Sequence, residues 1–235
     1  MNNINIFIGY DSWQDHSDKY LHVINPPFCV TKQSILQHHT NKSVSISIKP
    51  VILSEQIECG RYYREPDGTT SSEFTYTRFL IPDICEYEGV AIFCDSDFLW
   101  RCDITELLNY YHEKYSVMCV QHDYVPKFQT KMDGKKQAAY PRKNWSSLMM
   151  FNCAHPDCRN LSVDNVSTKS PQWLHRMEWT HDSNIGNIPL EYNWLEGEYD
   201  PRVLPKAIHF TNGGPWHQTW SGDYKSLWEN VANML

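Results

Sequence analysis

The chain has 235 residues, a length that suits one large domain or one domain with an insertion. Its formal charge is −7, and its one basic cluster, at 127–143, is interrupted by Asp133, so nucleic acid is an unlikely partner. No run reaches the roughly 20 apolar residues of a membrane span, and the first residues lack the features of a secretory leader, so we expect a cytoplasmic protein.

Apolar periodicity and turn residues predict alternating strands and helices. In chain order we expect a strand at 4–9, a helix at 28–39, a strand at 44–48 that stops before Pro50, a polar loop at 54–73, a helix at 74–85, a strand at 89–94, a helix at 105–114, a strand at 115–121, a polar loop at 122–143, a strand at 147–152, a helix at 171–177, a strand at 206–211 and a helix at 224–233. This alternation predicts an α/β fold with a mostly parallel central sheet flanked by helices.

Ligands of such sheets gather at the carboxyl ends of the strands. Residues 9–11, Gly-Tyr-Asp, follow the first predicted strand, and residues 95–97, Asp-Ser-Asp, follow the strand at 89–94. Both segments therefore belong on the same edge of the sheet, which is the expected position of the site.

The carboxylates of Asp95 and Asp97 stand at i and i+2 just after a buried strand. If the backbone turns there, both converge on one hard cation, and their oxygen atoms suit Mg²⁺ or Mn²⁺. The structural alternative is a helix cap, with Asp97 or Asp103 at the start of the helix near Thr105. The motif alone is too common to decide between these readings.

Two other segments strengthen the metal hypothesis. The helix at 74–85 carries Arg78 in the pattern Tyr-Thr-Arg-Phe-Leu-Ile-Pro. Near the carboxyl end, His209 closes a strand and precedes Gly213, Gly214 and the pair Pro-Trp. A histidine in this place offers a third metal ligand, and the glycine turn offers backbone N–H groups to a phosphate.

In their order along the chain, these motifs resemble those of GT-A glycosyltransferases, and most closely glycosyltransferase family 8, the glycogenin and bacterial galactosyltransferase group. The resemblance spans nearly the whole chain. It implies a single GT-A domain over 1–235, with a nucleotide-binding half at 1–121 and an acceptor- and sugar-binding half at 122–235. It also implies transfer of a sugar from a nucleoside-diphosphate sugar, with a UDP-sugar favoured, to a hydroxyl acceptor of unknown identity, with retention of configuration.

The resemblance also implies roles for individual residues. Asp95, Asp97 and His209 match the ligands of a Mn²⁺ or Mg²⁺ ion, and His181 with Asp182 resembles the polar pair at the reactive carbon of the sugar. The residues expected to contact the donor are Gly9, Tyr10, Asp11, Arg78, Asp95, Ser96, Ser147, Asn152, Gly213 and Gly214.

The sequence departs from the family at two points. The family has a lysine for the diphosphate directly before Pro-Trp, where this chain has Gly214; His217 and Arg78 are candidates to replace it. The segment beside the transferred sugar has Ser146 and Ser147 where Ala-Gly is usual, so the identity of the sugar does not carry over.

Other classes of protein remain as alternatives. A non-catalytic carbohydrate-binding scaffold of the same fold explains the aromatic content of 14%, but not three potential metal ligands. A phosphohydrolase expects Thr or Val where Leu99 stands, and a nucleotidyltransferase expects a glycine-rich basic loop that residues 9–11 do not form. A metal titration separates the enzyme from the scaffold.

Overall fold

The computed structural model describes residues 3–15, 26–66, 68, 70–127, 140–217 and 219–235. Most of the loop predicted at 122–143, with its basic cluster, lies outside the described residues. Within the described part, no helix is long and apolar enough to span a membrane.

The central sheet has six strands in the order β2-β1-β3-β6-β5-β7. Each neighbouring pair is parallel except those of β6, which runs antiparallel to both β3 and β5. The strands are β1 (Asn3–Gly9), β2 (Ser45–Val51), β3 (Val90–Cys94), β5 (Val117–Val120), β6 (Leu148–Asn152) and β7 (Ile185–Ile188). The predicted α/β fold with a mostly parallel sheet is therefore confirmed.

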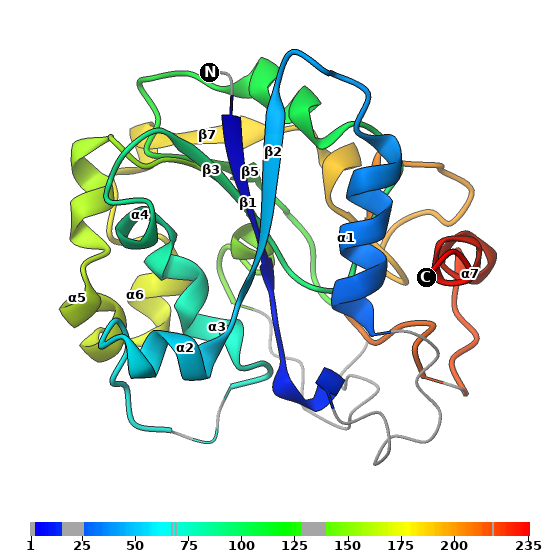
Figure 1. Ribbon diagram of the computed structural model, residues 1–235, viewed down its shortest axis with the longest axis horizontal. Coiled ribbons are helices and arrows are strands. Elements are labelled where there is room, and N and C mark those ends of the chain that lie inside the picture. Colours follow the sequence, from blue (N-terminus) through cyan, green and yellow to red (C-terminus); the bar gives the residue numbers. More distant parts are fainter. Residues whose placement is uncertain (1–2, 16–25, 67, 69, 128–139, 218) are drawn as a thin grey trace.

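Helices cover both faces of this sheet. Helices α2 to α6 lie on one side, and α1 lies on the other with α7 beyond it (Figure 1). The helices are α1 (Pro27–His38), α2 (Leu53–Glu58), α3 (Phe74–Thr77), α4 (Ile81–Ile84), α5 (Val163–Thr168), α6 (Pro171–His175) and α7 (Lys225–Ala232). Short 3-10 segments are Ser12–Asp15, Arg78–Leu80, Ile104–Tyr110, Trp145–Ser147, Pro156–Asn160, Asp182–Asn184 and Leu190–Tyr192.

The alternation of side chains along the strands divides the core between these two faces. On β1, Ile6 and Ile8 pack with Ile35 of α1, whereas Phe7 joins the cluster on the opposite face. Phe93 of β3 lies in the same cluster as Phe7. Because both faces of β3, β5 and β6 are buried, these strands are continuous apolar runs in the sequence, whereas the edge strand β2 alternates polar and apolar residues over Ser45–Ile48.

A second, three-stranded sheet completes the carboxyl edge, with β4 (Phe98–Trp100), β9 (Ala207–His209) and β8 (Trp194–Leu195) in that order. Strand β9 pairs antiparallel with β4, and this register sets His209 opposite Phe98. Phe210, just after β9, packs with Trp228 of α7 and Val30 of α1 in a third apolar cluster. This packing holds the carboxyl-terminal segment against the central domain.

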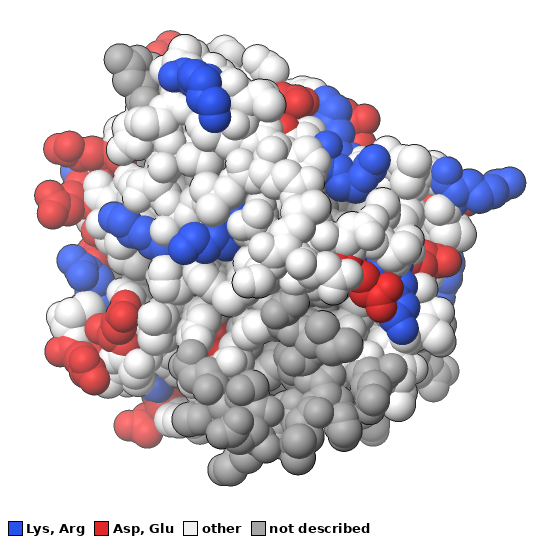
Figure 2. Space-filling view, turned by 45° about the vertical axis from the view of Figure 1, so that its right-hand side comes forward, with Lys and Arg blue, Asp and Glu red and all other residues white. Residues whose placement is uncertain are grey.

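The surface carries charges of both signs. On the face that Figure 2 shows, Lys and Arg side chains are interspersed with Asp and Glu side chains, and the described residues form no continuous basic field there. A duplex-binding surface needs a cluster of cations to neutralise phosphates. The described residues on this face form no such cluster.

Proline explains two differences between prediction and structure. Strand β2 continues through Pro50, contrary to the prediction, because β2 is an edge strand and one side of it needs no N–H donor. The helix predicted at 74–85 is broken into α3, a 3-10 turn and α4. Pro82 has no N–H to give to the carbonyl of Arg78 and its ring crowds that carbonyl, which disfavours an unbroken α-helix.

Other elements also differ from the prediction. Helix α2 lies inside the segment predicted as a loop at 54–73, and the helix predicted at 105–114 is a shorter 3-10 segment, Ile104–Tyr110. The side chain of Asp103 accepts a hydrogen bond from the N–H of Thr105 and so caps that segment. Strands β4, β7 and β8 and helix α5 were not predicted, because runs of two to six residues carry little periodicity.

Helix α1 fixes the loop that follows β3. The Thr31 hydroxyl lies 2.6 Å from the Ser96 carbonyl oxygen and 2.7 Å from that of Phe98. Ser34, one turn later, accepts a hydrogen bond from the N–H of Trp100 at 3.0 Å. All these contacts are buried, so the helix holds the backbone of the Asp-x-Asp segment without help from water.

We expect Thr31→Val to lower the free energy of unfolding by about 1–3 kcal/mol, because it leaves two buried carbonyl groups without this donor. Urea unfolding measures the change. Thr31→Ser keeps the hydroxyl and serves as the matched control. A Thr31→Val variant as stable as the wild type, with the loss of stability in Thr31→Ser instead, would show that the methyl group, and not the hydrogen bond, holds the loop.

Candidate metal and donor site

The site lies where the central strands end. Strands β1 and β3 are parallel and paired, so Gly9 and Cys94 reach the same edge of the sheet, as predicted. A cleft of about 700 Å³ opens at this edge. Its lining comes from several parts of the chain. The first half of the chain contributes Asp11 and Trp13 after β1, Leu53, Ile57, Tyr62, Arg64 and Glu65 in and after α2, Ser72, Glu73, Phe74, Tyr76 and Arg78 around α3, and Asp95, Ser96 and Asp97 after β3. The segment after β9 contributes Phe210, Thr211, Asn212, Gly213, Trp216 and His217.

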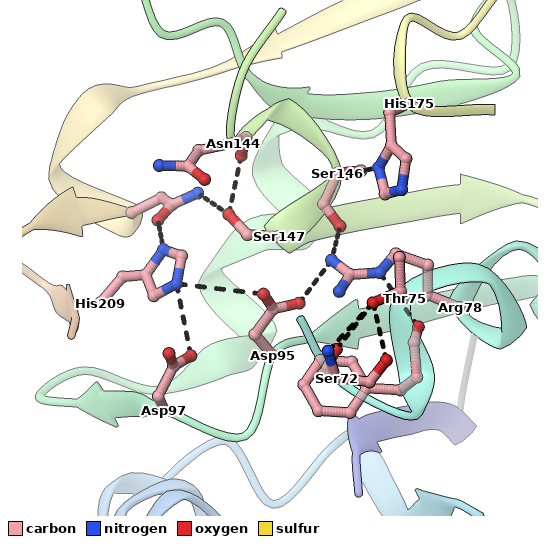
Figure 3. A network of polar contacts seen from close by, with 12 residues as sticks. Ser72, Thr75, Arg78, Asp95, Asp97, Asn144, Ser146, Ser147, His175 and His209 are labelled. Carbon is pink, nitrogen blue, oxygen red and sulfur yellow. Dashed lines mark hydrogen bonds and ion pairs between the residues drawn. The ribbon is translucent and has the colours of Figure 1, made fainter. Parts of the chain in front are cut away.

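Three side chains converge on one point beside this cleft, and two of them, Asp95 and Asp97, belong to its lining, whereas His209 does not. One ligand atom each from Asp95, Asp97 and His209 lies within 4.8 Å of the others. The Nε2 atom of His209 lies 3.3 Å from Oδ1 of Asp97 and 4.0 Å from Oδ2 of Asp95 (Figure 3). His209 is buried, and its ring stacks on Phe98 with a centroid distance of 4.5 Å. Strand pairing between β4 and β9 thus brings the histidine to the carboxylates.

The three donor atoms fit a divalent cation. Metal–oxygen bonds of about 2.1 Å place neighbouring ligands of an octahedral ion about 3 Å apart and opposite ligands about 4 Å apart. The distances of 3.3 Å and 4.0 Å from His209 match these two values. Two carboxylates and one imidazole are also a donor set that Mn²⁺ and Mg²⁺ accept, with positions left open for a substrate.

Arg78 holds one of the two carboxylates in place. Its Nη1 donates to Oδ1 of Asp95 at 2.6 Å and to the carbonyl oxygen of Ser146 at 2.9 Å. Its guanidinium group lies over the rings of Phe74 and Phe93, 5.1 Å from each centroid. Oδ1 of Asp95 is therefore bound to Arg78, and Oδ2 is the oxygen on the side of His209.

Asp11 places a third carboxyl group in the cleft, and it is 9% exposed. Burial raises the pKa of Asp11 from 3.8 to about 7, opposed by a hydrogen bond from the N–H of Glu73, and the negative charges of Glu73, Asp97 and Asp95 raise it further. Near neutral pH this carboxyl group therefore exists partly in its protonated form, which donates a hydrogen bond.

The structure separates the predicted donor contacts into two groups. Asp11, Arg78, Asp95, Ser96, Asp97 and Gly213 line the cleft, whereas Gly9, Tyr10, Ser147, Asn152 and Gly214 do not belong to its lining. Gly9 is needed for packing, because a Cβ atom there would lie 2.5 Å from the ring of Phe74. A Cβ atom at Gly214 would lie 2.1 Å from the ring of Trp216.

Three predicted residues lie elsewhere. Asn152 ends β6 and pairs with Val90, at the amino end of β3, because β6 is antiparallel to β3. His181 is exposed and caps a 3-10 segment, with Nδ1 accepting from the N–H of Ser183. The Asp182 side chain is 76% exposed and pairs with Arg142 at 2.6 Å. None of the three lines the cleft, and their roles stay predictions.

Several polar residues around the site were not predicted. Asn193 is fully buried and contacts Nδ1 of His209 at 3.0 Å. His175 of α6 contacts the Ser146 hydroxyl at 2.9 Å, and burial together with the charge of Arg78 lowers its pKa to about 3. Both sit in segments without a recognisable motif.

A mostly parallel α/β sheet with an Asp-x-Asp and histidine cluster at its carboxyl edge defines the class of GT-A glycosyltransferases. The chain belongs to glycosyl transferase family 8, whose sequence profile matches residues 3–200. It is 43% identical over 231 residues to Protein CDI of Arabidopsis thaliana, and this alignment covers 96% of the present chain and 84% of Protein CDI. The protein is therefore a glycosyltransferase, as the resemblance predicted.

Solved structures share the fold at low identity. The bifunctional glycosyltransferase WbbM has a TM-score of 0.62 at 19% identity, covering 99% of this chain and 50% of that one. Apo GlyE of Streptococcus pneumoniae TIGR4 has a TM-score of 0.60 at 15% identity, covering 99% and 60%. The galactosyltransferase LgtC, solved with donor and acceptor sugar analogues, has a TM-score of 0.56 at 13% identity, covering 98% and 96%. The chain thus spans half to three fifths of the first two proteins.

The pKa of Asp11 predicts a pH dependence of stability. Because the folded value of about 7 exceeds 3.8, the folded protein keeps a proton that the unfolded chain loses, and stability falls as pH rises through that window. Asp11→Asn removes this loss. We expect the variant, in EDTA, to unfold with a free energy higher than that of the wild type by up to about 4 kcal/mol above pH ~8, and equal to it below pH ~4.

Urea unfolding at the two pH values measures this difference. Asp200→Asn is the control, because the pKa of that exposed carboxyl group is lowered to about 2 by Arg202, so its removal brings no stabilisation at high pH. An Asp11→Asn variant that matches the wild type at both pH values would contradict the raised pKa.

Proposed function

We propose that this glycosyltransferase is metal-dependent and transfers a sugar from a nucleoside-diphosphate sugar, with a UDP-sugar favoured, to a hydroxyl acceptor. The observation that carries the proposal is the convergence of Asp95, Asp97 and His209 beside a cleft whose lining includes the two aspartates. A Mn²⁺ or Mg²⁺ ion held there would supply positive charge to the diphosphate as it leaves. A non-catalytic scaffold needs no such set of ligands.

The remaining residues of the cleft have roles that follow from their positions. Asp11, just after β1, is placed to contact the nucleotide. Ser96 and Gly213 also line the cleft, and we propose that they contact the donor. Arg78 keeps the Asp95 carboxylate oriented, which preserves the geometry for the cation.

The diphosphate lacks the lysine that the family provides. No lysine belongs to the described lining of the cleft; its basic side chains are Arg64, Arg78 and His217. Arg78 is bound to Asp95, while Arg64 lies over the ring of Tyr76 at 4.2 Å and donates to the carbonyl oxygen of Lys169 at 2.7 Å. His217 lies three residues after Gly214 and lines the cleft. Because it is the basic residue of the lining nearest in sequence to the position of the family's lysine, we propose that it contacts the diphosphate.

Retention of configuration is the stereochemical outcome that we propose. Inversion requires a free base beside the acceptor hydroxyl. Apart from the metal ligands, the carboxylates in the described lining are Asp11, Glu65 and Glu73. Glu73 accepts hydrogen bonds from the N–H and hydroxyl of Ser12, and Glu65 is exposed. The proposal of retention therefore rests on the resemblance to family 8, which also implies His181 and Asp182 as the polar pair at the reactive carbon of the sugar.

The division into a nucleotide-binding half at 1–121 and an acceptor- and sugar-binding half at 122–235 is part of the proposal. The first half supplies Asp11, Arg78, Asp95 and Asp97, and the second supplies His209 and the segment after it. The metal cluster joins the two halves, so neither half alone contains a complete site.

Release of nucleotide from a panel of UDP-, GDP- and CMP-sugars, with Mn²⁺ and with EDTA, tests the function. We expect turnover with UDP-sugars that requires Mn²⁺. Asp97→Asn should lower it by a factor of at least about 100, since loss of a metal ligand removes charge stabilisation worth several kcal/mol. Asp200→Asn, at an exposed carboxylate, is the matched control.

The panel also separates the alternatives. Nucleotide release that is unchanged in EDTA and in Asp97→Asn would refute the metal-dependent mechanism. Sugar binding without turnover of any donor would favour the non-catalytic scaffold.

A further inference from the structure

A chain of buried hydrogen bonds leads away from the metal cluster. Nδ1 of His209 contacts Oδ1 of Asn193 at 3.0 Å. Nδ2 of Asn193 donates to the Ser147 hydroxyl at 2.8 Å, and this hydroxyl donates to the carbonyl oxygen of Asn144 at 2.7 Å. Figure 3 shows His209, Ser147 and Asn144 along this path. His209, Asn193 and Ser147 are at most 2% exposed, so solvent does not replace these partners.

The chemistry of the far end fixes the direction of every bond. The Asn144 carbonyl oxygen only accepts, so the single hydrogen of the Ser147 hydroxyl points to it. The Ser147 oxygen must then accept from its other neighbour, which makes that neighbour the NH₂ group of Asn193. The amide oxygen of Asn193 consequently faces His209. With the amide turned round, the Ser147 hydroxyl would have to give its single hydrogen to the amide oxygen, and its hydrogen bond to the Asn144 carbonyl oxygen would be lost.

The direction of the bonds determines where His209 carries its hydrogen. Because the amide oxygen of Asn193 only accepts, Nδ1 of His209 must be the donor. In the neutral ring, Nε2 then has a lone pair, and it is Nε2 that lies 3.3 Å from Asp97. A ring in this tautomer presents a ligand atom to a cation between the carboxylates. The other tautomer would present a hydrogen.

We infer that Asn193 is a positioning residue for the metal site: it holds His209 in the tautomer and orientation that leave Nε2 free to bind a divalent cation. Strand β8 follows Asn193 directly and pairs with β9, with Leu195 opposite His209. This pairing holds the backbones of Asn193 and His209 close to each other. The inference rests on the proposed metal dependence. It adds a residue to the site that contacts neither the cation nor the donor.

Two substitutions of nearly equal size test the role. Asn193→Asp keeps an oxygen acceptor for Nδ1, whereas Asn193→Leu removes it. Partners of this kind affect metal affinity by about 10- to 100-fold. We therefore expect Mn²⁺ affinity, measured by titration followed by electron paramagnetic resonance, to fall by that factor in Asn193→Leu and to stay within about threefold of the wild type in Asn193→Asp.

Stability separates a positioning role from a structural one. Asn193→Asp buries a charge, so urea unfolding should show it to be at least as destabilised as Asn193→Leu. If Asn193 had only a structural role, Mn²⁺ affinity would fall in proportion to the loss of stability, and it would fall in both Asn193→Asp and Asn193→Leu. Asn160→Leu, which removes an amide bond to the Trp179 carbonyl away from the cleft, is the control for loss of an amide. Equal Mn²⁺ affinity in Asn193→Leu and the wild type would overturn the inference, as would equal losses in the Asp and Leu variants.

The tautomer itself provides a readout that needs no metal. Long-range ¹H–¹⁵N spectra of the metal-free protein at alkaline pH, with His209 assigned through His209→Gln, should show the hydrogen on Nδ1 in the wild type and Asn193→Asp, and its loss from Nδ1 in Asn193→Leu. A hydrogen on Nε2 in the wild type would overturn the inference. A wild type that has the predicted tautomer but binds no Mn²⁺ would refute the proposed metal dependence and still support the role of Asn193.

Discussion

The antiparallel pairing of β4 with β9 is the interaction on which the site depends. It places His209 opposite Phe98, directly after the two aspartates that follow β3. Without this pairing the central sheet would still end in two carboxylates, but the third ligand would be missing. The packing of Phe210 on Trp228 and Val30 stabilises the same arrangement from behind. The carboxyl-terminal segment is therefore part of the site and not an appendage to it.

Burial of so many polar groups carries a cost that the surrounding contacts offset. Asp95 is held by Arg78, the backbone of the loop by Thr31, and His209 by Asn193. Buried charges are tolerated when they are paired and hydrogen-bonded, and such networks restrict side chains to one orientation. The contacts of Arg78, Thr31 and Asn193 thus hold the side chains of the site in one orientation. A defined orientation of this kind is what binding of a cation and a diphosphate would require.

Much of this architecture was predictable because it depends on strong local patterns. The apolar runs before Gly9 and Asp95 identified the central strands, and the place of His209 at the end of a strand was also predicted. The direction of β6 was not predictable, since a buried apolar run does not reveal its orientation, and this direction places Asn152 at the amino end of β3. Asn193 became visible only through tertiary contacts, because an isolated asparagine has no local signature.

The most direct test of a metal site at Asp95, Asp97 and His209 is a crystal structure of the protein grown with Mn²⁺ and UDP, with anomalous diffraction data that locate manganese. The account predicts one strong anomalous peak bonded to Asp97, Nε2 of His209 and the Asp95 oxygen not held by Arg78, with the diphosphate of UDP on its open side. UDP bound in the cleft with no manganese peak among these three side chains, or a peak at another set of ligands, would contradict it.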